Sequence, residues 1–90
     1  MNNEVLFSFV GITAAILTSS GLIPQAIKGI QTKSLRDVSA GMLIILAIGT
    51  FLWFIYGLHK GDLIIIGANT VTCSLSVAIL ILKSIYDRKN

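Results

Sequence analysis

The charged residues of the chain divide it into three long apolar stretches. Residues 5–27, 38–58 and 63–82 contain no Asp, Glu, Lys or Arg, and they are 23, 21 and 20 residues long. A helix needs roughly 20 apolar residues to cross the hydrocarbon core of a bilayer. The pattern therefore predicts an all-α membrane protein, a bundle of three transmembrane helices in one domain that spans residues 1–90.

The composition supports this prediction. Hydrophobic residues make up 54% of the chain and charged residues 12%, about half the charged share of a typical soluble domain. In water, helices this apolar would have no face to expose to solvent. In a bilayer they satisfy their backbone hydrogen bonds internally, so we expect helices over about residues 5–27, 39–59 and 62–83.

The basic residues predict how the chain lies in the membrane. Six of the seven fall on one side, namely Lys28, Lys33, Arg36, Lys83, Arg88 and Lys89, and only Lys60 falls on the other. The positive-inside rule places the first side in the cytoplasm, with the N-terminus outside and the C-terminus cytoplasmic. No basic patch is interleaved with aromatic residues, so the net charge of +3 does not indicate nucleic acid as a partner, and the apolar segments make membrane lipids the expected surroundings.

A large aromatic residue and a carboxamide are predicted to lie at the same depth. Trp53 precedes Gly61, the midpoint of the second connection, by eight residues, and Asn69 follows it by eight. Two antiparallel helices joined by a short turn place equidistant residues at one level, here on the outer side of the membrane centre. An indole wall and a group that both donates and accepts hydrogen bonds suit a neutral polar solute.

Helical spacing places further residues on the same faces. The second segment has one continuous face, at steps of three and four residues, made of Met42, Leu46, Gly49, Trp53, Tyr56 and Lys60. The third has a mildly polar face made of Asn69, Thr72, Cys73 and Ser76. If both faces point into one cavity, its outer mouth is formed by Tyr56, Lys60 and Asp62. Its inner mouth is then formed by Pro24, Gln25 and Met42.

These residues also have plainer interpretations. Trp53 could belong to the aromatic belt at the membrane surface, although five residues separate it from His59. Asn69 could join two helices through an interhelical hydrogen bond, worth about 0.6–2 kcal/mol. Lys60 and Asp62 could be an ordinary exposed pair.

The first segment is interrupted near its inner end by residues 18–25, Thr-Ser-Ser-Gly-Leu-Ile-Pro-Gln. Pro24 has no backbone N–H to donate to the carbonyl of Ser20, and its ring crowds that carbonyl, so we expect a kink. The kink could be static or could act as a hinge, and the residues alone leave both open.

No Asp, Glu, Lys, Arg or His lies inside the three segments. Transport coupled to protons or ions usually requires one, so a solute would move only down its own gradient. The sequence also has no nucleophile next to a base, no HExxH motif and no phosphate loop. We therefore expect neither an enzyme nor a bound metal or cofactor.

Three helices provide too little wall to enclose a path for a solute. Two copies in the same orientation, related by an axis normal to the membrane, would place six helices around a central cavity. Transporters are known that are built from parallel repeats of this kind. We therefore expect a parallel homodimer that forms a six-helix transporter.

Several short motifs stand at the spacings of one known family. They are Pro24-Gln25, Thr32-Lys33-Ser34, Asp37-Val38-Ser39, Leu52-Trp53-Phe54-Ile55-Tyr56-Gly57, Asp62-Leu63 and Ala68-Asn69-Thr70-Val71-Thr72. By these motifs the chain resembles, over essentially its whole length, the bacterial SemiSWEET sugar transporters of the SWEET (MtN3/saliva) family in the PQ-loop superfamily.

The resemblance implies a homodimer in the bacterial inner membrane that passes a mono- or disaccharide by alternating access. It makes Trp53 and Asn69 the sugar-binding pair. The outer gate would be Tyr56, Lys60 and Asp62, closed by pairing across the dimer. The inner gate would have Pro24 as its hinge beside Gln25, with Met42 and Leu46 narrowing that end.

This chain departs from the family at two of these positions. Members often carry Arg where it has Lys60, and Lys lacks the planar fork that binds a carboxylate through two hydrogen bonds. An aromatic residue often stands where it has Leu46. The sequence also leaves two other functions open: an amino-acid transporter, as in other PQ-loop proteins, and a non-transporting subunit of a membrane assembly.

Overall fold

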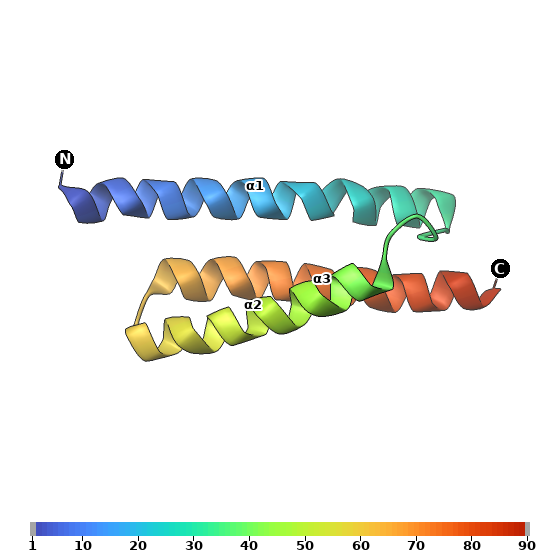
Figure 1. Ribbon diagram of the computed structural model, residues 1–90. Coiled ribbons are helices and arrows are strands. Elements are labelled where there is room, and N and C mark those ends of the chain that lie inside the picture. Colours follow the sequence, from blue (N-terminus) through green and yellow to red (C-terminus); the bar gives the residue numbers. More distant parts are fainter. Residues whose placement is uncertain (1, 90) are drawn as a thin grey trace.

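The computed structural model describes residues 2–89, and this part of the chain forms three helices (Figure 1). α1 spans Asn3–Thr32, α2 spans Ala40–Lys60 and α3 spans Leu63–Lys89. α1 and α3 continue past the ends expected at residues 27 and 83. The residues that follow the apolar segments include Lys, Gln and Arg, which are good helix formers and extend both helices.

Each helix begins at a polar capping residue. The side chains of Asn2, Ser39 and Asp62 accept hydrogen bonds from backbone N–H groups in the first turns of α1, α2 and α3. α2 ends at Gly61, whose φ of 67° is left-handed and is adopted most easily by glycine. The chain therefore reverses direction within two residues between α2 and α3.

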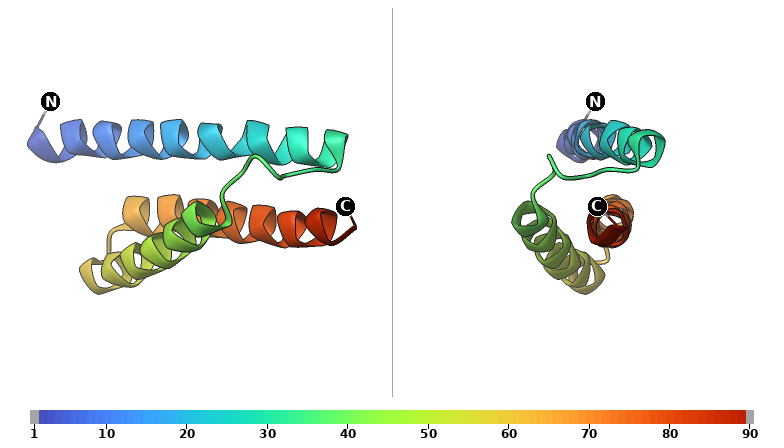
Figure 2. Two further views of the ribbon diagram at one scale, coloured as in Figure 1. Left: turned by 45° about the vertical axis from the view of Figure 1, so that its right-hand side comes forward. Right: turned by 90° about the vertical axis from the view of Figure 1, so that its right-hand side faces the viewer.

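α3 is the central helix of the bundle. α1 and α2 each pack against α3 and, over the described residues, not against each other (Figure 2). α2 runs antiparallel to the other two helices (Figure 1). The bundle measures 53 × 23 × 15 Å, and its length exceeds the roughly 40–45 Å of a bilayer with its headgroups. Both ends of the bundle can therefore reach water.

The buried core lies toward the end where α1 stops and α2 starts. Its residues are Leu22, Leu35, Leu43 and Ile79. Leu35 belongs to the α1–α2 connection and fits against Gly29, where a larger residue would collide with it. Toward the opposite end, α2 and α3 approach closely because Gly57 presents no side chain to Ile65 and Ile66.

Most of the apolar surface has no neighbour within the single chain. In the most apolar window of each helix, only 6%, 11% and 17% of the residues are buried, for α1, α2 and α3 in turn. All three helices are long and apolar enough to cross a membrane. The protein is therefore an integral membrane protein, with lipid or another chain covering this surface.

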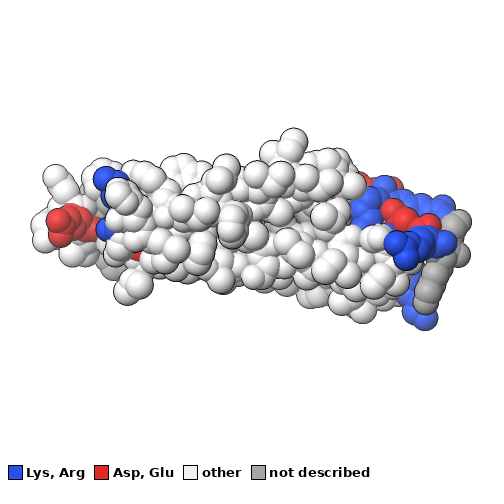
Figure 3. Space-filling view, turned by 90° about the horizontal axis from the view of Figure 1, so that it is seen from below, with Lys and Arg blue, Asp and Glu red and all other residues white. Residues whose placement is uncertain are grey.

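Charged side chains gather at the two ends of the bundle and leave its middle uncharged (Figure 3). The end with the α1–α2 connection carries most of the described bases: Lys28, Lys33, Arg36, Lys83 and Arg88. Lys60 lies at the opposite end, with Glu4 and Asp62. The asymmetry seen in the sequence thus corresponds to two physical ends of the molecule.

Residues 18–25 do not interrupt α1, contrary to the expectation from the sequence. The helix continues through Pro24 to Thr32, and Figure 1 shows no sharp bend in it. Only one backbone hydrogen bond is lost at a proline, and the intact turns on both sides keep the helix continuous. The nearby hydroxyl of Ser20 donates to the carbonyl of Leu17 at 2.9 Å. A hinge at Pro24 stays a prediction.

Candidate functional site

One face of α2 is left open in the single chain. α2 packs against α3 through Leu43, Thr50 and Gly57, which are buried. Trp53 and Tyr56 lie outside this contact and are 56% and 46% exposed. Trp53 and Tyr56 of the face predicted from the spacing lie on this open face, whereas Leu46 of the same predicted face packs against the core.

Trp53, Tyr56 and Lys60 form a continuous stack along this face. The rings of Trp53 and Tyr56 meet edge to face, with centroids 5.5 Å apart and planes at 89°. The Nζ atom of Lys60 lies 5.8 Å from the centre of the Tyr56 ring. Such contacts contribute about 0.5–1.5 and 0.5–1 kcal/mol respectively. Trp53 and Tyr56 border a cavity of about 360 Å³ together with Gly49 and Leu52.

Trp53 and Asn69 lie at the same level of the bundle. Gly57 of α2 faces Ile65 of α3. Trp53 lies four residues from Gly57, and Asn69 lies four residues from Ile65, so each is about one turn further in. This register agrees with the equal depth expected from the sequence.

The carboxamide of Asn69 uses only its nitrogen for a hydrogen bond within the single chain. Its Nδ2 donates to the carbonyl of Ile65 in the same helix at 2.8 Å, so the bond is not an interhelical one. Within the described residues its oxygen accepts no hydrogen bond. The interpretation of Asn69 as a link between helices therefore finds no support in a single chain.

A single chain does not bring Trp53 and Asn69 into one cavity. Asn69 borders a smaller cavity, of about 150 Å³, whose other walls include Phe51, Phe54 and Cys73. Trp53 borders the separate cavity described above. Neither of these two cavities is lined by both residues.

Two residues of the polar face on α3 do not line an open cavity, contrary to expectation. Thr72 and Ser76 are buried, and the Ser76 hydroxyl donates to the carbonyl of Thr72 at 2.8 Å. Their burial follows from the central position of α3, because residues between its contacts with α1 and α2 are covered. The periodicity of a single helix cannot reveal that it has neighbours on two sides.

The three residues expected at the outer mouth lie at one end of the bundle but do not form a cluster. Lys60 lies over Tyr56, whereas Asp62 caps α3 through its Oδ1 atom. Among the described residues no ion pair joins Lys60 to Asp62. Asp62 instead borders a cavity of about 620 Å³ shared with Glu4 and Gly11 of α1.

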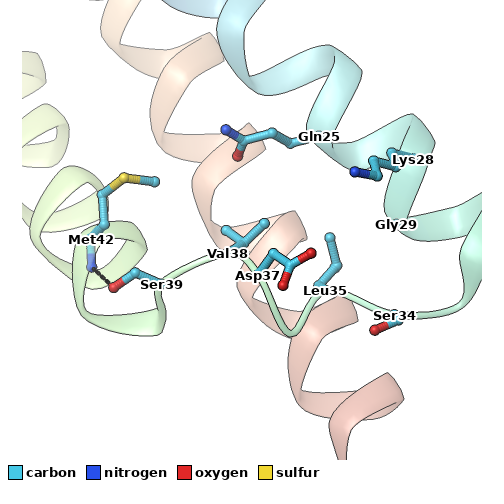
Figure 4. Close-up of a pocket in the computed structure, with 9 residues that line it drawn as sticks. All are labelled: Gln25, Lys28, Gly29, Ser34, Leu35, Asp37, Val38, Ser39 and Met42. Atoms are coloured by element: carbon cyan, nitrogen blue, oxygen red, sulfur yellow. Dashed lines mark hydrogen bonds between the residues drawn. The ribbon is translucent and has the colours of Figure 1, made fainter.

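The opposite end contains a recess of about 370 Å³ beside the α1–α2 connection (Figure 4). This connection recess is lined by Gln25, Lys28, Gly29, Ser34, Leu35, Asp37, Val38, Ser39 and Met42. It brings together Gln25 and Met42, two of the residues expected at the inner mouth. Leu46 instead packs against the core, and Pro24 lies exposed on α1.

Sequence analysis did not identify the role of Lys83. Its Nζ donates to the carbonyl of Leu35 at 3.1 Å and to Oδ2 of Asp87 at 2.8 Å, which ties the end of α3 to the α1–α2 connection. The only signal in the sequence is Leu35 itself, an apolar residue among the polar residues of the connection.

The described residues provide hydrogen bonds and apolar walls at the middle of the bundle. Their Lys, Arg, Asp and Glu side chains lie toward its two ends (Figure 3). Within residues 2–89, no group of three or more His, Cys, Asp or Glu side chains could hold a metal ion. This arrangement suits the binding of a neutral molecule.

Comparison with known proteins gives consistent matches over most of the chain. Residues 5–90 match a family described as "Sugar efflux transporter for intercellular exchange". The chain is 42% identical over 81 residues to "Sugar transporter SemiSWEET" of Bradyrhizobium diazoefficiens, which covers 90% of this chain and 94% of that protein. It is 41% identical over 76 residues to the protein of the same name from Leptospira biflexa, and this match covers 84% of this chain and 89% of that protein.

A solved structure gives a similar match. It is described as "Crystal structure of a bacterial homologue of SWEET transporters", and its TM-score to this fold is 0.83. The two chains are 44% identical, and the match covers 90% of this chain and 98% of that one. Sequence and fold therefore agree over nearly the same residues.

Proposed function

The chain belongs to the SWEET family of sugar transporters, and from this premise we propose that it passes a neutral sugar, a mono- or disaccharide, across a membrane. The observation that carries the proposal is the open face of α2, where Trp53 and Tyr56 border a cavity within the charge-free stretch of that helix. An aromatic wall without charge suits a neutral solute with an apolar ring face.

The transporter is a parallel homodimer. A single chain leaves the Trp53 face uncovered and keeps the cavities of Trp53 and Asn69 apart. A second copy in the same orientation would cover this face and complete a central path between six helices. The bases gathered at one end support a single orientation, with that end in the cytoplasm and the N-terminus outside. The bacterial relatives support a location in the inner membrane.

Trp53 and Asn69 bind the sugar at the level they share. The apolar face of the sugar ring packs on the indole of Trp53. The carboxamide oxygen of Asn69 accepts a hydrogen bond from a sugar hydroxyl, because its Nδ2 is already bonded to Ile65.

Tyr56, Lys60 and Asp62 form the outer gate. Asp62 uses only Oδ1 to cap α3, so its Oδ2 is available to Lys60 of the second copy. When the gate opens, Lys60 returns to the Tyr56 ring of its own chain, the position described above.

Gln25 and Met42, which border one recess, form the inner gate together with Leu46. Pro24 serves as its hinge, because the missing N–H lowers the cost of bending α1 at this point. Alternate opening of the two gates exposes the sugar first to one side of the membrane and then to the other. No Asp, Glu, Lys, Arg or His lies in the three apolar stretches, so transport follows the sugar gradient alone.

Uptake by reconstituted vesicles tests the proposal. We expect vesicles with the purified protein to accumulate labelled glucose or sucrose without an ion gradient, and Trp53→Ala and Asn69→Ala to reduce uptake to the background of empty vesicles. Ile48→Ala is the matched control, because Ile48 is exposed on α2 outside the Trp53 cavity. Full uptake by both site variants would contradict the assigned site, and dependence on an ion gradient would contradict uniport.

A further inference from the structure

The connection recess has opposite charges on its walls that do not contact each other. Lys28 reaches into it from α1 and Asp37 from the connection (Figure 4). Within the described residues no ion pair joins them, so space remains between the ammonium and the carboxylate. A molecule that lies between them can accept a hydrogen bond from Lys28 and donate one to Asp37, and such charge-assisted bonds are stronger than neutral ones.

The same recess contains a buried acceptor without a partner. The Oε1 atom of Gln25 is buried and, among the described residues, accepts no hydrogen bond. A buried acceptor left in this condition costs about 1–3 kcal/mol. This atom is closed off from the recess, so a bound donor group would remove the cost by drawing the Gln25 side chain toward it.

These walls match the chemistry of a sugar. Adjacent sugar hydroxyls both donate and accept, so they can meet Gln25, Asp37 and Lys28 at once. Leu35 and Met42 offer apolar surface for the C–H groups of the ring. The charges of the recess nearly balance, which favours a neutral ligand, and about 370 Å³ falls at the lower end of the range for small-molecule sites.

The recess is held open by contacts that do not depend on a ligand. Leu35, one of its walls, is buried against Gly29. The Leu35 carbonyl accepts a hydrogen bond from Lys83, which is fixed in turn by Asp87. The wall is therefore formed in advance, which reduces the ordering cost of binding.

We propose that the connection recess is a second sugar-binding site, one in each chain, separate from the Trp53 level. It rests on the proposed transport of sugar. Met42 belongs both to the recess and to the predicted face of α2, and it lies 11 residues, or about 16 Å of helix, from Trp53. A sugar that leaves the Trp53 level along this face would meet the recess before it reaches water.

Protection of an engineered thiol tests the proposal. The only cysteine is removed by Cys73→Ser, and Ser34→Cys then places a thiol in the recess, while Gln31→Cys places one on the exposed end of α1 outside it. Both proteins are labelled with a maleimide in lipid nanodiscs, with glucose, sucrose or glycine as the probe. At a sugar concentration about ten times its Kd, labelling of Ser34→Cys should slow about tenfold, and labelling of Gln31→Cys should not change.

A second set of variants separates local binding from a remote effect. Protection of Ser34→Cys should persist when Trp53→Ala is added and should be lost with Lys28→Met or Asp37→Asn. Unchanged labelling of Gln31→Cys in each background shows that the fold is intact. Loss of protection with Trp53→Ala would overturn the proposal, because the shielding would then come from sugar bound at the Trp53 level.

Two further outcomes would also overturn it. Protection by glycine and not by sugar would make the recess a site for a zwitterion. Protection that survives both Lys28→Met and Asp37→Asn would show that the charged walls are not used. Failure of the transport proposal itself is seen independently, as uptake of labelled sugar by wild-type vesicles that does not exceed the background of empty vesicles.

Discussion

Trp53 and Gly57 lie four residues apart on α2 and have opposite surroundings. Trp53 is 56% exposed on the open face, whereas Gly57 is buried against α3. A Cβ atom at Gly57 would lie 2.8 Å from Cγ2 of Ile65 and 3.1 Å from the backbone nitrogen of Ile66. A Cβ atom at Gly49, on the open face, would meet nothing within 4 Å. The first glycine therefore serves helix packing and the second leaves space.

Valine at these two positions should have different effects on stability. Gly57→Val should lower the stability of the purified protein by about 1–3 kcal/mol, because the backbone of α3 must move to admit the side chain. Gly49→Val introduces the same residue into open space and should change stability by no more than about 0.5 kcal/mol. Thermal unfolding in detergent measures both. Equal losses at the two positions would contradict this difference in packing, because valine is a better helix former than glycine and propensity alone would cost nothing.

α3 holds residues of the proposed outer gate at its start and a wall of the connection recess near its end. At its start, Asp62 accepts backbone hydrogen bonds from Ile64 and Ile65 at 3.0 and 3.2 Å. Near its end, Lys83 holds the carbonyl of Leu35. Asp62 therefore has a structural role in addition to the proposed gate role, and its substitution affects both unless the two are separated.

Two substitutions of Asp62 separate these roles. Asp62→Ala removes the cap and should cost about 0.5–2 kcal/mol of stability, whereas Asp62→Asn retains a capping oxygen and should cost much less. Both remove the charge, so both should alter sugar uptake if Asp62 pairs with Lys60 across the dimer. Unfolding and uptake are measured on the same preparations. Wild-type uptake by Asp62→Asn would leave Asp62 with its capping role alone.

The molecule as a whole leaves most of its apolar surface without a neighbour in the same chain. It is only 15 Å across in its thinnest direction, and Trp53 and Asn69 border different cavities within it. A symmetric second copy would repeat the same residues on the other side of a central path. The function proposed here therefore belongs to the pair and not to the single chain.

Mixed vesicles test whether two intact copies are required. Wild-type protein and Trp53→Ala are mixed in equal amounts before reconstitution, with total protein held constant. If both copies must supply Trp53, only one dimer in four is intact and uptake should fall to about a quarter of the wild-type rate. If the chains act independently, uptake should fall to about half of the wild-type rate. Unmixed wild-type protein at half the amount serves as the reference.

Much of the fold follows from the sequence because membrane-spanning helices are local structures. The length of each charge-free stretch and the absence of charge within it predict all three helices. The equal depth of Trp53 and Asn69 also follows, since the short turn at Gly61 fixes the register of α2 and α3. By contrast, Pro24 led to a wrong expectation, because the neighbouring turns of α1 keep the helix continuous.

The sequence by itself determined the number of helices, their connection by short turns and the uncharged middle of the bundle, because these depend on hydrophobicity and on residues close together in the chain. Only the tertiary structure decided that α3 is central, that Thr72 and Ser76 are covered, and that Lys83 reaches Leu35. It also decided that Lys28 and Asp37 face one recess. These features depend on which helix faces meet across long stretches of sequence, and periodicity within one helix carries no information about its neighbours.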